Sequence, residues 1–358
     1  MNKRSLYLFL LFPVFLTGCI EQKVVDEIGI IHNVGFDYED GGLLETAVLP
    51  EYTDTDRTNL ISAEEHSPIQ LKSSLSKASQ YDIQYGQIRV LVLGKELSEK
   101  GITEIIESIC KEPSLGNVRI ATANERAADI LKATVSLRPL YLMELVDNGV
   151  LREGVPDTSL HTLLDQFYGQ GLDVYIPNLK VDSSGILKID GLSIFKGDKL
   201  KLAISNQEMY LFKLMNEKNK KGTYEFTLEK EGKEQIIGIE SLYGKHDIVL
   251  KRKNEGVVAT INLKLDLELN GLPTWMDIKK GEDREYLKNY IERTYSKEIH
   301  ELLTKFQTNQ VDPLGLGIIF RAGEKGWSEH DFYQNVYPDM KFKVNTDVII
   351  RQSGAGKS

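Results

Sequence analysis

The chain has 358 residues and is acidic, with 44 Lys and Arg against 53 Asp and Glu and a formal net charge of −9. This length predicts two or three domains, and a hydrophobic fraction of 41% argues against a disordered chain. The acidic balance argues against nucleic acid as a partner and against attachment to anionic lipid by charge alone, because both need clustered Lys and Arg.

The first 19 residues have the pattern of a bacterial lipoprotein signal. A basic start at Lys3 and Arg4 is followed by an apolar stretch over residues 6–16 and then, after two small residues, by Cys19. The stretch is shorter than the ~20 residues that a transmembrane helix needs, so we expect a signal peptide over residues 1–18 that is removed before Cys19. The Cys19 thiol would then carry a diacylglycerol, and two acyl chains hold a protein durably on a membrane. The alternative is an ordinary secreted protein in which Cys19 has no such role.

Residues 19–186 are expected to form an N-terminal α/β domain, because short apolar strands alternate with amphipathic helices. The hydrophobic pattern predicts a hairpin of strands over 24–36 and 43–49, and further strands at 88–93 and 118–121. Helices are predicted at 68–79, 102–110, 125–131, 140–148 and 158–169, the last with Asp157 or Thr158 as its N-cap.

Residues 187–357 are expected to form a C-terminal α+β domain, with a further split near residue 247 as an option. A meander of strands over 173–181, 187–195 and 199–204 leads into it, followed by a helix over 205–216 and a strand over 223–228. Strict alternation over 261–269 and 340–350 predicts strands, the first antiparallel with one wet face. Between them, residues 282–307 carry an apolar stripe that predicts one long amphipathic helix covering this antiparallel sheet.

Two groups of side chains are interpreted as core. Cys110 is the only thiol besides Cys19, and we expect it to be buried because it follows four isoleucines at helical spacing, Ile102, Ile105, Ile106 and Ile109. The aromatic group Trp327, Phe332 and Tyr333 is expected to pack against the long helix, with an aromatic binding edge as the alternative.

No motif in the chain predicts catalysis, a cofactor or a metal ion. The tail 354–358 resembles the end of a phosphate-binding loop, but Arg351 stands where that loop needs a glycine. Segment 312–317 has glycines spaced as in a dinucleotide-binding motif, but it follows a helix instead of the strand that such a motif needs. We therefore interpret it as a helix stop in which Asp312 caps the next turn. A contact of Asp312 with a partner is the alternative. The six histidines have no pair at metal-ligand spacing.

Segments along nearly the whole chain have the order and spacing of one known family. The N-terminal segments are 30–37, 89–97, 101–102, 127–131 and 176–177, and the C-terminal ones are 190–200, 306–307, 312–317, Trp327 and the last strand up to Gly354. Together with Cys19 they resemble the Ger(x)C lipoproteins, the C subunits of spore germinant receptors. Two positions depart from the family pattern: Ile20 stands where Trp often follows the lipidated cysteine, and Phe332 and Tyr333 stand where a second Trp is common.

The resemblance implies a non-enzymatic subunit needed for nutrient-triggered spore germination. The diacylglycerol on Cys19 would anchor this subunit to the outer face of the spore inner membrane. Its partners would be two integral-membrane receptor subunits, which it would bind through protein–protein contacts. The implied fold is an elongated, multi-domain arrangement of mixed α/β type, with mixed sheets flanked by helices. Two alternatives stay open: a solute-binding lipoprotein that captures the nutrient in a cleft between domains, and a lipid-tethered hydrolase, for which the sequence offers no reaction centre.

Overall fold

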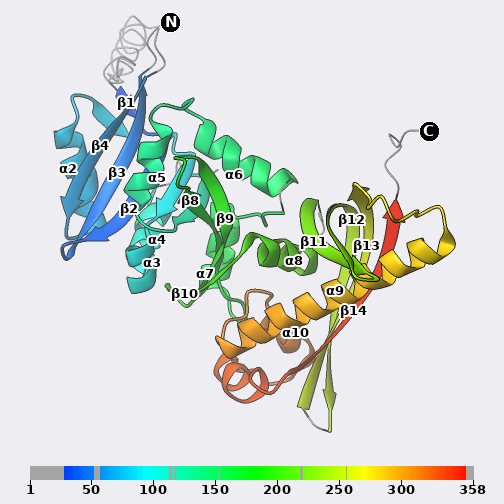
Figure 1. Cartoon of the computed structure of the whole chain (residues 1–358). Coiled ribbons are helices and arrows are strands. Elements are labelled where there is room, and N and C mark those ends of the chain that lie inside the picture. Colours follow the sequence, from blue (N-terminus) through cyan, green and yellow to red (C-terminus); the bar gives the residue numbers. More distant parts are fainter. Residues whose placement is uncertain are drawn as a thin grey trace, which may run out of the picture.

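The part of the chain that the structure describes folds around two large sheets and one small sheet, with helices packed on their faces (Figure 1). The computed structural model describes residues 28–51, 57–112, 115–116, 118–152, 154–217, 221–254 and 256–351. Within these ranges, no helix combines the length and the apolar character needed to cross a membrane. The expected mixed α/β class, with sheets flanked by helices, is confirmed.

An eight-stranded sheet organises the N-terminal half, in the order β10-β9-β8-β7-β6-β2-β3-β4. Its strands are β2 (Asn33–Glu39), β3 (Gly42–Glu51), β4 (Arg57–Glu65), β6 (Val90–Leu93), β7 (Arg119–Ala123), β8 (Tyr175–Val181), β9 (Leu187–Lys196) and β10 (Lys199–Ile204). The central strands β2, β6, β7 and β8 run parallel, and all four side chains of β6 are buried, as expected where helices cover both faces. A separate two-stranded sheet consists of β1 (Ile28–Ile30) and β5 (Asp82–Gln84).

Helices on the eight-stranded sheet contribute to two cores. One core includes α2 (Pro68–Ala78), α3 (Lys95–Lys100), α4 (Thr103–Cys110) and α7 (Leu160–Tyr168). The other includes α5 (Ala127–Thr134) and α6 (Tyr141–Arg152) and continues without a break into the C-terminal half.

The C-terminal half is built on a four-stranded sheet covered by one long helix. The strands lie in the order β11 (Gly222–Lys230), β12 (Lys233–Lys253), β13 (Gly256–Asn270) and β14 (Lys341–Arg351). The helix is α9 (Gly281–Thr308), and its buried residues are the predicted stripe, Leu287, Ile291, Tyr295, Ile299, Leu302, Leu303 and Phe306. One detail differs from prediction: β14 pairs in parallel with β13, because α9 carries the chain back along the sheet, so the sheet is mixed instead of antiparallel.

Helix α8 (Asn206–Asn216) connects the two large sheets. It begins with a capping box between Ser205 and Glu208, and the run from Met209 to Met215 is entirely buried. The ring centroid of Phe212 lies 4.9 Å from that of Tyr175 on β8 and 6.1 Å from that of Phe306 on α9. The two halves of the chain therefore share one core across α8.

The expected domain boundary between residues 186 and 187 falls in the turn between β8 and β9, and these two strands pair with each other. Residue 247, the optional further split, lies inside β12. The division of the chain into domains stays a prediction.

Two local predictions are wrong and a third is incomplete. Cys110 is exposed, because Ile105, Ile106 and Ile109 face the core and the next residue, at the end of α4, turns away from it. The N-cap of α7 is Ser159, whose Oγ accepts a hydrogen bond from the Thr162 N–H at 3.2 Å. The helix stop expected at 312–317 is confirmed, since α9 ends at Thr308 and Gly315 has a φ of +68°, but a new helix, α10 (Leu316–Gly323), follows at once.

Candidate functional site

The one site residue predicted from the sequence, Cys19, lies outside the described residues, so its lipidation stays a prediction. Across the described ranges, no group of three or more His, Cys, Asp or Glu side chains is placed to hold a metal ion. A cluster of two buried aspartates with a half-buried lysine and a half-buried tyrosine does occur where the segment before β8 meets the loop before α10. We call it the junction cluster, and it consists of Asp173, Lys196, Asp312 and Tyr333.

Asp312 is the centre of the junction cluster and is only 1% exposed. Its Oδ1 accepts a hydrogen bond from the Leu316 N–H at 3.0 Å and its Oδ2 one from the Gly317 N–H at 2.9 Å, so it caps α10 as predicted. The backbones also meet, because the Asp312 N–H donates to Asp173 Oδ2 at 2.7 Å and the Asp173 N–H donates to the Asp312 carbonyl at 3.0 Å. One aspartate thus starts a helix and ties it to a segment 139 residues away.

Lys196 and Tyr333 complete the cluster. The Lys196 Nζ donates to both carboxylate oxygens of Asp173, at 3.0 and 3.3 Å, and lies 3.9 Å from the centroid of the Tyr333 ring. The Tyr333 hydroxyl donates to Asp312 Oδ2 at 3.2 Å. Burial raises the pKa of Asp312 to about 7, and burial also raises the pKa of Asp173, although Lys196 opposes that shift. Repulsion from the Asp173 carboxylate adds to the rise in the pKa of Asp312, whereas the hydrogen bonds from the Gly317 and Leu316 N–H groups oppose it.

Two glycines allow the backbones to touch at this place. Gly171 has a φ of +84°, and a Cβ on it would lie 2.8 Å from the Gly317 carbonyl carbon. A Cβ on Gly317 would lie 2.7 Å from the Gly171 Cα. The Gly171 carbonyl accepts from the Ile318 N–H at 3.1 Å, and the Gly171 N–H donates to Glu329 Oε1 at 2.7 Å. The second glycine of segment 312–317 therefore serves close backbone packing.

A pocket of about 280 Å³ opens beside the junction cluster. Its volume is close to the lower limit of small-molecule sites. Charges of both signs and two aromatic rings line it, contributed by Phe167, Asp173, Lys196, Glu329 and Tyr333.

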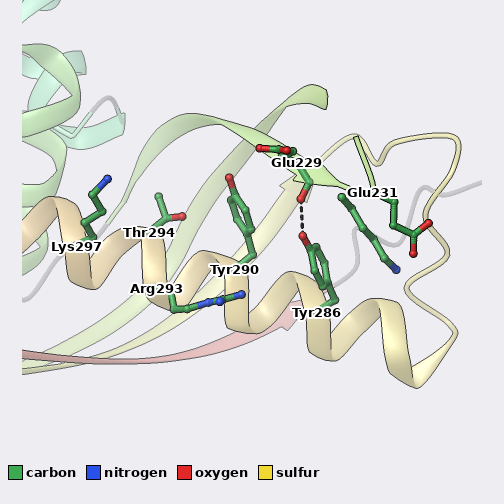
Figure 2. Close-up of a pocket in the computed structure, with 8 residues that line it drawn as sticks. Glu229, Glu231, Tyr286, Tyr290, Arg293, Thr294 and Lys297 are labelled. Atoms are coloured by element: carbon green, nitrogen blue, oxygen red, sulfur yellow. Dashed lines mark hydrogen bonds between the residues drawn. The ribbon is translucent and has the colours of Figure 1, made fainter. Parts of the chain in front are cut away.

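A more open pocket of about 450 Å³ lies between α9 and the outer edge of β11 (Figure 2). The Tyr286 hydroxyl donates to the Glu229 carbonyl, and the Tyr290 hydroxyl donates to the Thr227 carbonyl at 2.7 Å. Both carbonyls belong to β11, which is an edge strand of the four-stranded sheet. The tyrosines therefore occupy hydrogen-bond acceptors that an additional strand would otherwise use. We interpret this pocket as a protected sheet edge.

Segments that carry the family resemblance meet in space at other helix starts. Asp37 at the end of one segment accepts from the N–H groups of Ala127 and Ala128 in another, at 2.7 and 2.9 Å, and so caps α5. Gly94 from a third segment lies against this carboxylate, and a Cβ there would be 1.9 Å from Asp37 Oδ1. These contacts stabilise the fold and suggest no reaction.

The contact between the segments 101–102 and 190–200 also stabilises the fold and suggests no reaction. The Ile102 N–H donates to the Asp198 carbonyl at 3.0 Å, and the Thr103 hydroxyl donates to Asp198 Oδ2 at 2.8 Å. A Cβ on Gly101 would lie 2.6 Å from that oxygen. The turn between β9 and β10 is thereby fixed to the start of α4.

The sequence identified Asp312 as a cap but not the residues around it. From the sequence, Asp173 was predicted only to begin a strand and Lys196 only to lie in a turn. Contacts between residues far apart in the sequence leave no local pattern that would reveal them. The aromatic group is core in part: Phe332 is 1% exposed, and its ring lies 5.1 Å from Phe320 of α10. α10 is thus a packing partner that the sequence did not predict, and the group belongs to the same core as the buried stripe of α9.

Comparisons with known proteins cover most of the chain. Residues 21–181 match a family model described as "Spore germination protein N-terminal domain", and residues 190–354 match one described as "Spore germination B3/ GerAC like, C-terminal". The chain is 25% identical over 354 residues to the spore germination protein GerQC of Bacillus cereus, covering 97% of this chain and 98% of that protein. Its fold is similar to the crystal structure of the GerBC protein, with a TM-score of 0.57, 17% identity, and coverage of 88% of this chain and 96% of that one.

Proposed function

Because this chain belongs to the Ger(x)C family of spore germination proteins, we propose that it is a lipid-anchored accessory subunit of a spore germinant receptor. The observation that carries the proposal is the family match over residues 21–181 and 190–354, joined to the lipoprotein signal that ends at Cys19. In this role the chain is needed for nutrient-triggered germination and performs no catalysis. It acts through contacts with two integral-membrane subunits.

The diacylglycerol on Cys19 would hold the folded part at the outer surface of the spore inner membrane. Eight residues lie between Cys19 and Ile28, the first residue of β1, so the two Cα atoms are at most about 30 Å apart. The net charge of −9 provides no attraction to anionic lipid, so the acyl chains carry the attachment.

A subunit that works by contact needs its binding surfaces held in fixed positions. The continuous core through α8 and the junction cluster supply this, because both connect the eight-stranded sheet to the C-terminal half. The buried polar contacts at the junction are hydrogen-bonded to one another, which favours one arrangement over a range of arrangements.

The substitution Cys19→Ser tests the anchor. We expect the wild-type chain from spore inner membranes to partition into the detergent phase, and the variant to be found in the aqueous phase with nutrient-triggered germination reduced to that of a strain lacking the chain. The exposed thiol offers a matched control, since Cys110→Ser should keep both properties. Unchanged partitioning of Cys19→Ser would refute lipidation, and normal germination of a strain lacking this chain and its related receptors would refute the role.

Direct capture of the nutrient is the second candidate function, and the pocket beside the junction cluster favours it. A Lys196 ammonium and the Asp173 and Glu329 carboxylates would suit a small ligand that carries both charges. Titration calorimetry of the mature chain with each nutrient that triggers germination tests this function. Heat that is absent in Lys196→Met would support it, and no heat with any active nutrient would exclude it.

A further inference from the structure

The four-stranded sheet has one covered face and one open face. Side chains at odd positions of β13, from Val257 to Leu269, are buried beneath α8 and α9. Residues directly opposite each other on neighbouring strands point to the same face. The register therefore places the even-numbered residues of β13 and their partners on β11, β12 and β14 on the other side, which we call the open face.

Side chains of α9 bind backbone groups on both edges of this sheet. Tyr286 caps the Glu229 carbonyl of β11 (Figure 2), and Tyr290 caps the Thr227 carbonyl of the same strand. On the opposite edge, Glu292 of α9 accepts a hydrogen bond from the Val348 N–H of β14 at 2.9 Å. An incoming strand would have to break these contacts, whereas a partner on the open face would not.

Apolar side chains lie in the middle of the open face. Tyr243 of β12 and Ile349 of β14 both pair with Asp266 of β13, one on each side of it. They keep 54% and 56% of their surface exposed, and Leu242 at the neighbouring bulge keeps 37%. Exposed apolar residues grouped in this way are typical of an interaction site.

Charge is separated on the two sides of this apolar centre. Toward the turn between β12 and β13, the open face carries two aspartates, Asp247 and Asp347, and six lysines: Lys245, Lys251, Lys253, Lys264, Lys341 and Lys343. Toward the other end it carries one arginine, Arg351, and six carboxylates: Glu225, Glu229, Glu234, Glu240, Asp266 and Glu268. One half of the described open face is thus clearly positive and the other half clearly negative.

We propose that the open face binds a second copy of this chain, around a two-fold axis that passes near Tyr243 and Ile349. In a two-fold interface the same patch is used on both copies, so a contact between two different positions is made twice. An axis at the apolar centre brings the lysines of each copy over the carboxylates of the other, with Tyr243 and Ile349 of both copies in the middle. An anionic membrane or an acidic protein would match the lysines but would be repelled by the carboxylates.

The size of the central part of the surface indicates a weak dimer. β12, β13 and β14 lie side by side over the 11 residues of β14, which gives a central patch of about 36 Å by about 15 Å; Glu225, Glu229 and Glu234 lie outside it. Such a patch is smaller than the roughly 800 Å² that each partner contributes to a standard interface. We expect dissociation in the micromolar range and weakening by salt, because exposed ion pairs are screened.

Charge reversal with complementation tests the proposal by sedimentation velocity. The protein is the mature chain from residue 19 onward with Cys19→Ser, so that acyl chains do not cause association. Lys245→Glu with Lys264→Glu should weaken the dimer at least tenfold, and Glu240→Lys with Glu268→Lys should do the same. A mixture of the two double variants should form a heterodimer, because each supplies the charge that the other needs. The matched control is Lys111→Glu with Lys132→Glu, an equal charge change at exposed lysines of the N-terminal half, and it should leave the dimer intact.

The proposal is overturned if the wild-type chain remains a monomer throughout the micromolar range. It is also overturned if only the lysine reversals weaken association, or if the two double variants fail to pair with each other. Binding of the wild-type chain to vesicles of phosphatidylglycerol, lost in the lysine variant, without any dimer in solution, would assign the face to a membrane instead.

Discussion

Buried charged side chains in this protein hold together segments that are distant in the sequence. Asp312 and Asp37 each cap a helix while contacting another segment, and Lys213, which is 1% exposed, donates to the carbonyls of Val150 and Val155 at 2.7 and 2.9 Å. Burial alone would make each of these groups costly, and the hydrogen bonds offset that cost. A substitution at such a residue removes an interaction and also leaves its partners buried without one.

The substitution Asp312→Ala should lower the free energy of unfolding by about 3 kcal/mol, because it removes an N-cap and leaves buried donors unpaired. Denaturant titration measures the loss. Ser328→Ala is the matched control, since Ser328 caps the short helix α11 (Glu329–Asp331) through an exposed contact of 3.4 Å, and it should cost about 1 kcal/mol or less. Equal losses in the two variants would contradict the assignment of Asp312 to the junction.

The burial of Glu45 leads us to expect that the stability of the protein depends on pH. It is 2% exposed on β3, its Oε1 accepts from the Tyr85 hydroxyl at 2.8 Å, and burial raises its pKa to about 7. Between about pH 4.5 and 7 the folded chain holds a proton that the unfolded chain releases, so this group makes stability fall as pH rises through that window. Glu45→Gln keeps the acceptor for Tyr85 without titrating. The difference in free energy of unfolding between Glu45→Gln and wild type should therefore shift in favour of the variant by on the order of 3 kcal/mol from pH 5 to pH 8.

Urea unfolding of both proteins at several pH values checks this prediction. Parallel curves of stability against pH, with a constant difference between wild type and Glu45→Gln, would show that the Glu45 carboxyl titrates normally in the folded chain.

At the level of elements, regular patterns were predictable and irregular ones were not. The stripe of α9 and the alternation of β13 repeat without interruption, so their period alone identifies them. β12 escaped prediction because a bulge between Ser241 and Tyr243 shifts its alternation by one residue. β4 was missed because it is a largely polar edge strand, and α10 because it is short and depends on the distant junction.

Helix α9 also protects both edges of its sheet, and this leads to a prediction. Tyr290→Phe combined with Glu292→Ala removes the side-chain partners of the Thr227 carbonyl and the Val348 N–H. We expect a modest loss of about 1 to 2 kcal/mol in stability but faster aggregation on warming, because uncapped edges pair with other chains. Thioflavin fluorescence follows the aggregation. Arg293→Ala, on the exposed side of the same helix, is the control, and equal aggregation of all three proteins would contradict the protective role.

At the scale of the whole molecule, the shared core through α8 makes the two sheets one mechanical unit. Tyr210 of α8 contributes to this core on the C-terminal side, with its ring 5.3 Å from that of Tyr224 on β11 and its hydroxyl 3.3 Å from that of Tyr295 on α9. The sequence predicted the elements on each side but not this connection, because it depends on packing between separate parts of the chain. A unit of this kind fits the proposed role of a subunit that acts through protein–protein contacts.

The central claim is that this chain works beside two integral-membrane subunits of a germinant receptor. Affinity purification of the tagged full chain from detergent-solubilised spore inner membranes, with mass spectrometry of the proteins that accompany it, tests this claim most directly. The account predicts recovery of two multi-spanning germination subunits together with a chain that carries a diacylglycerol on Cys19. Recovery of the chain alone, or of intact unacylated chain from the soluble fraction, would contradict it.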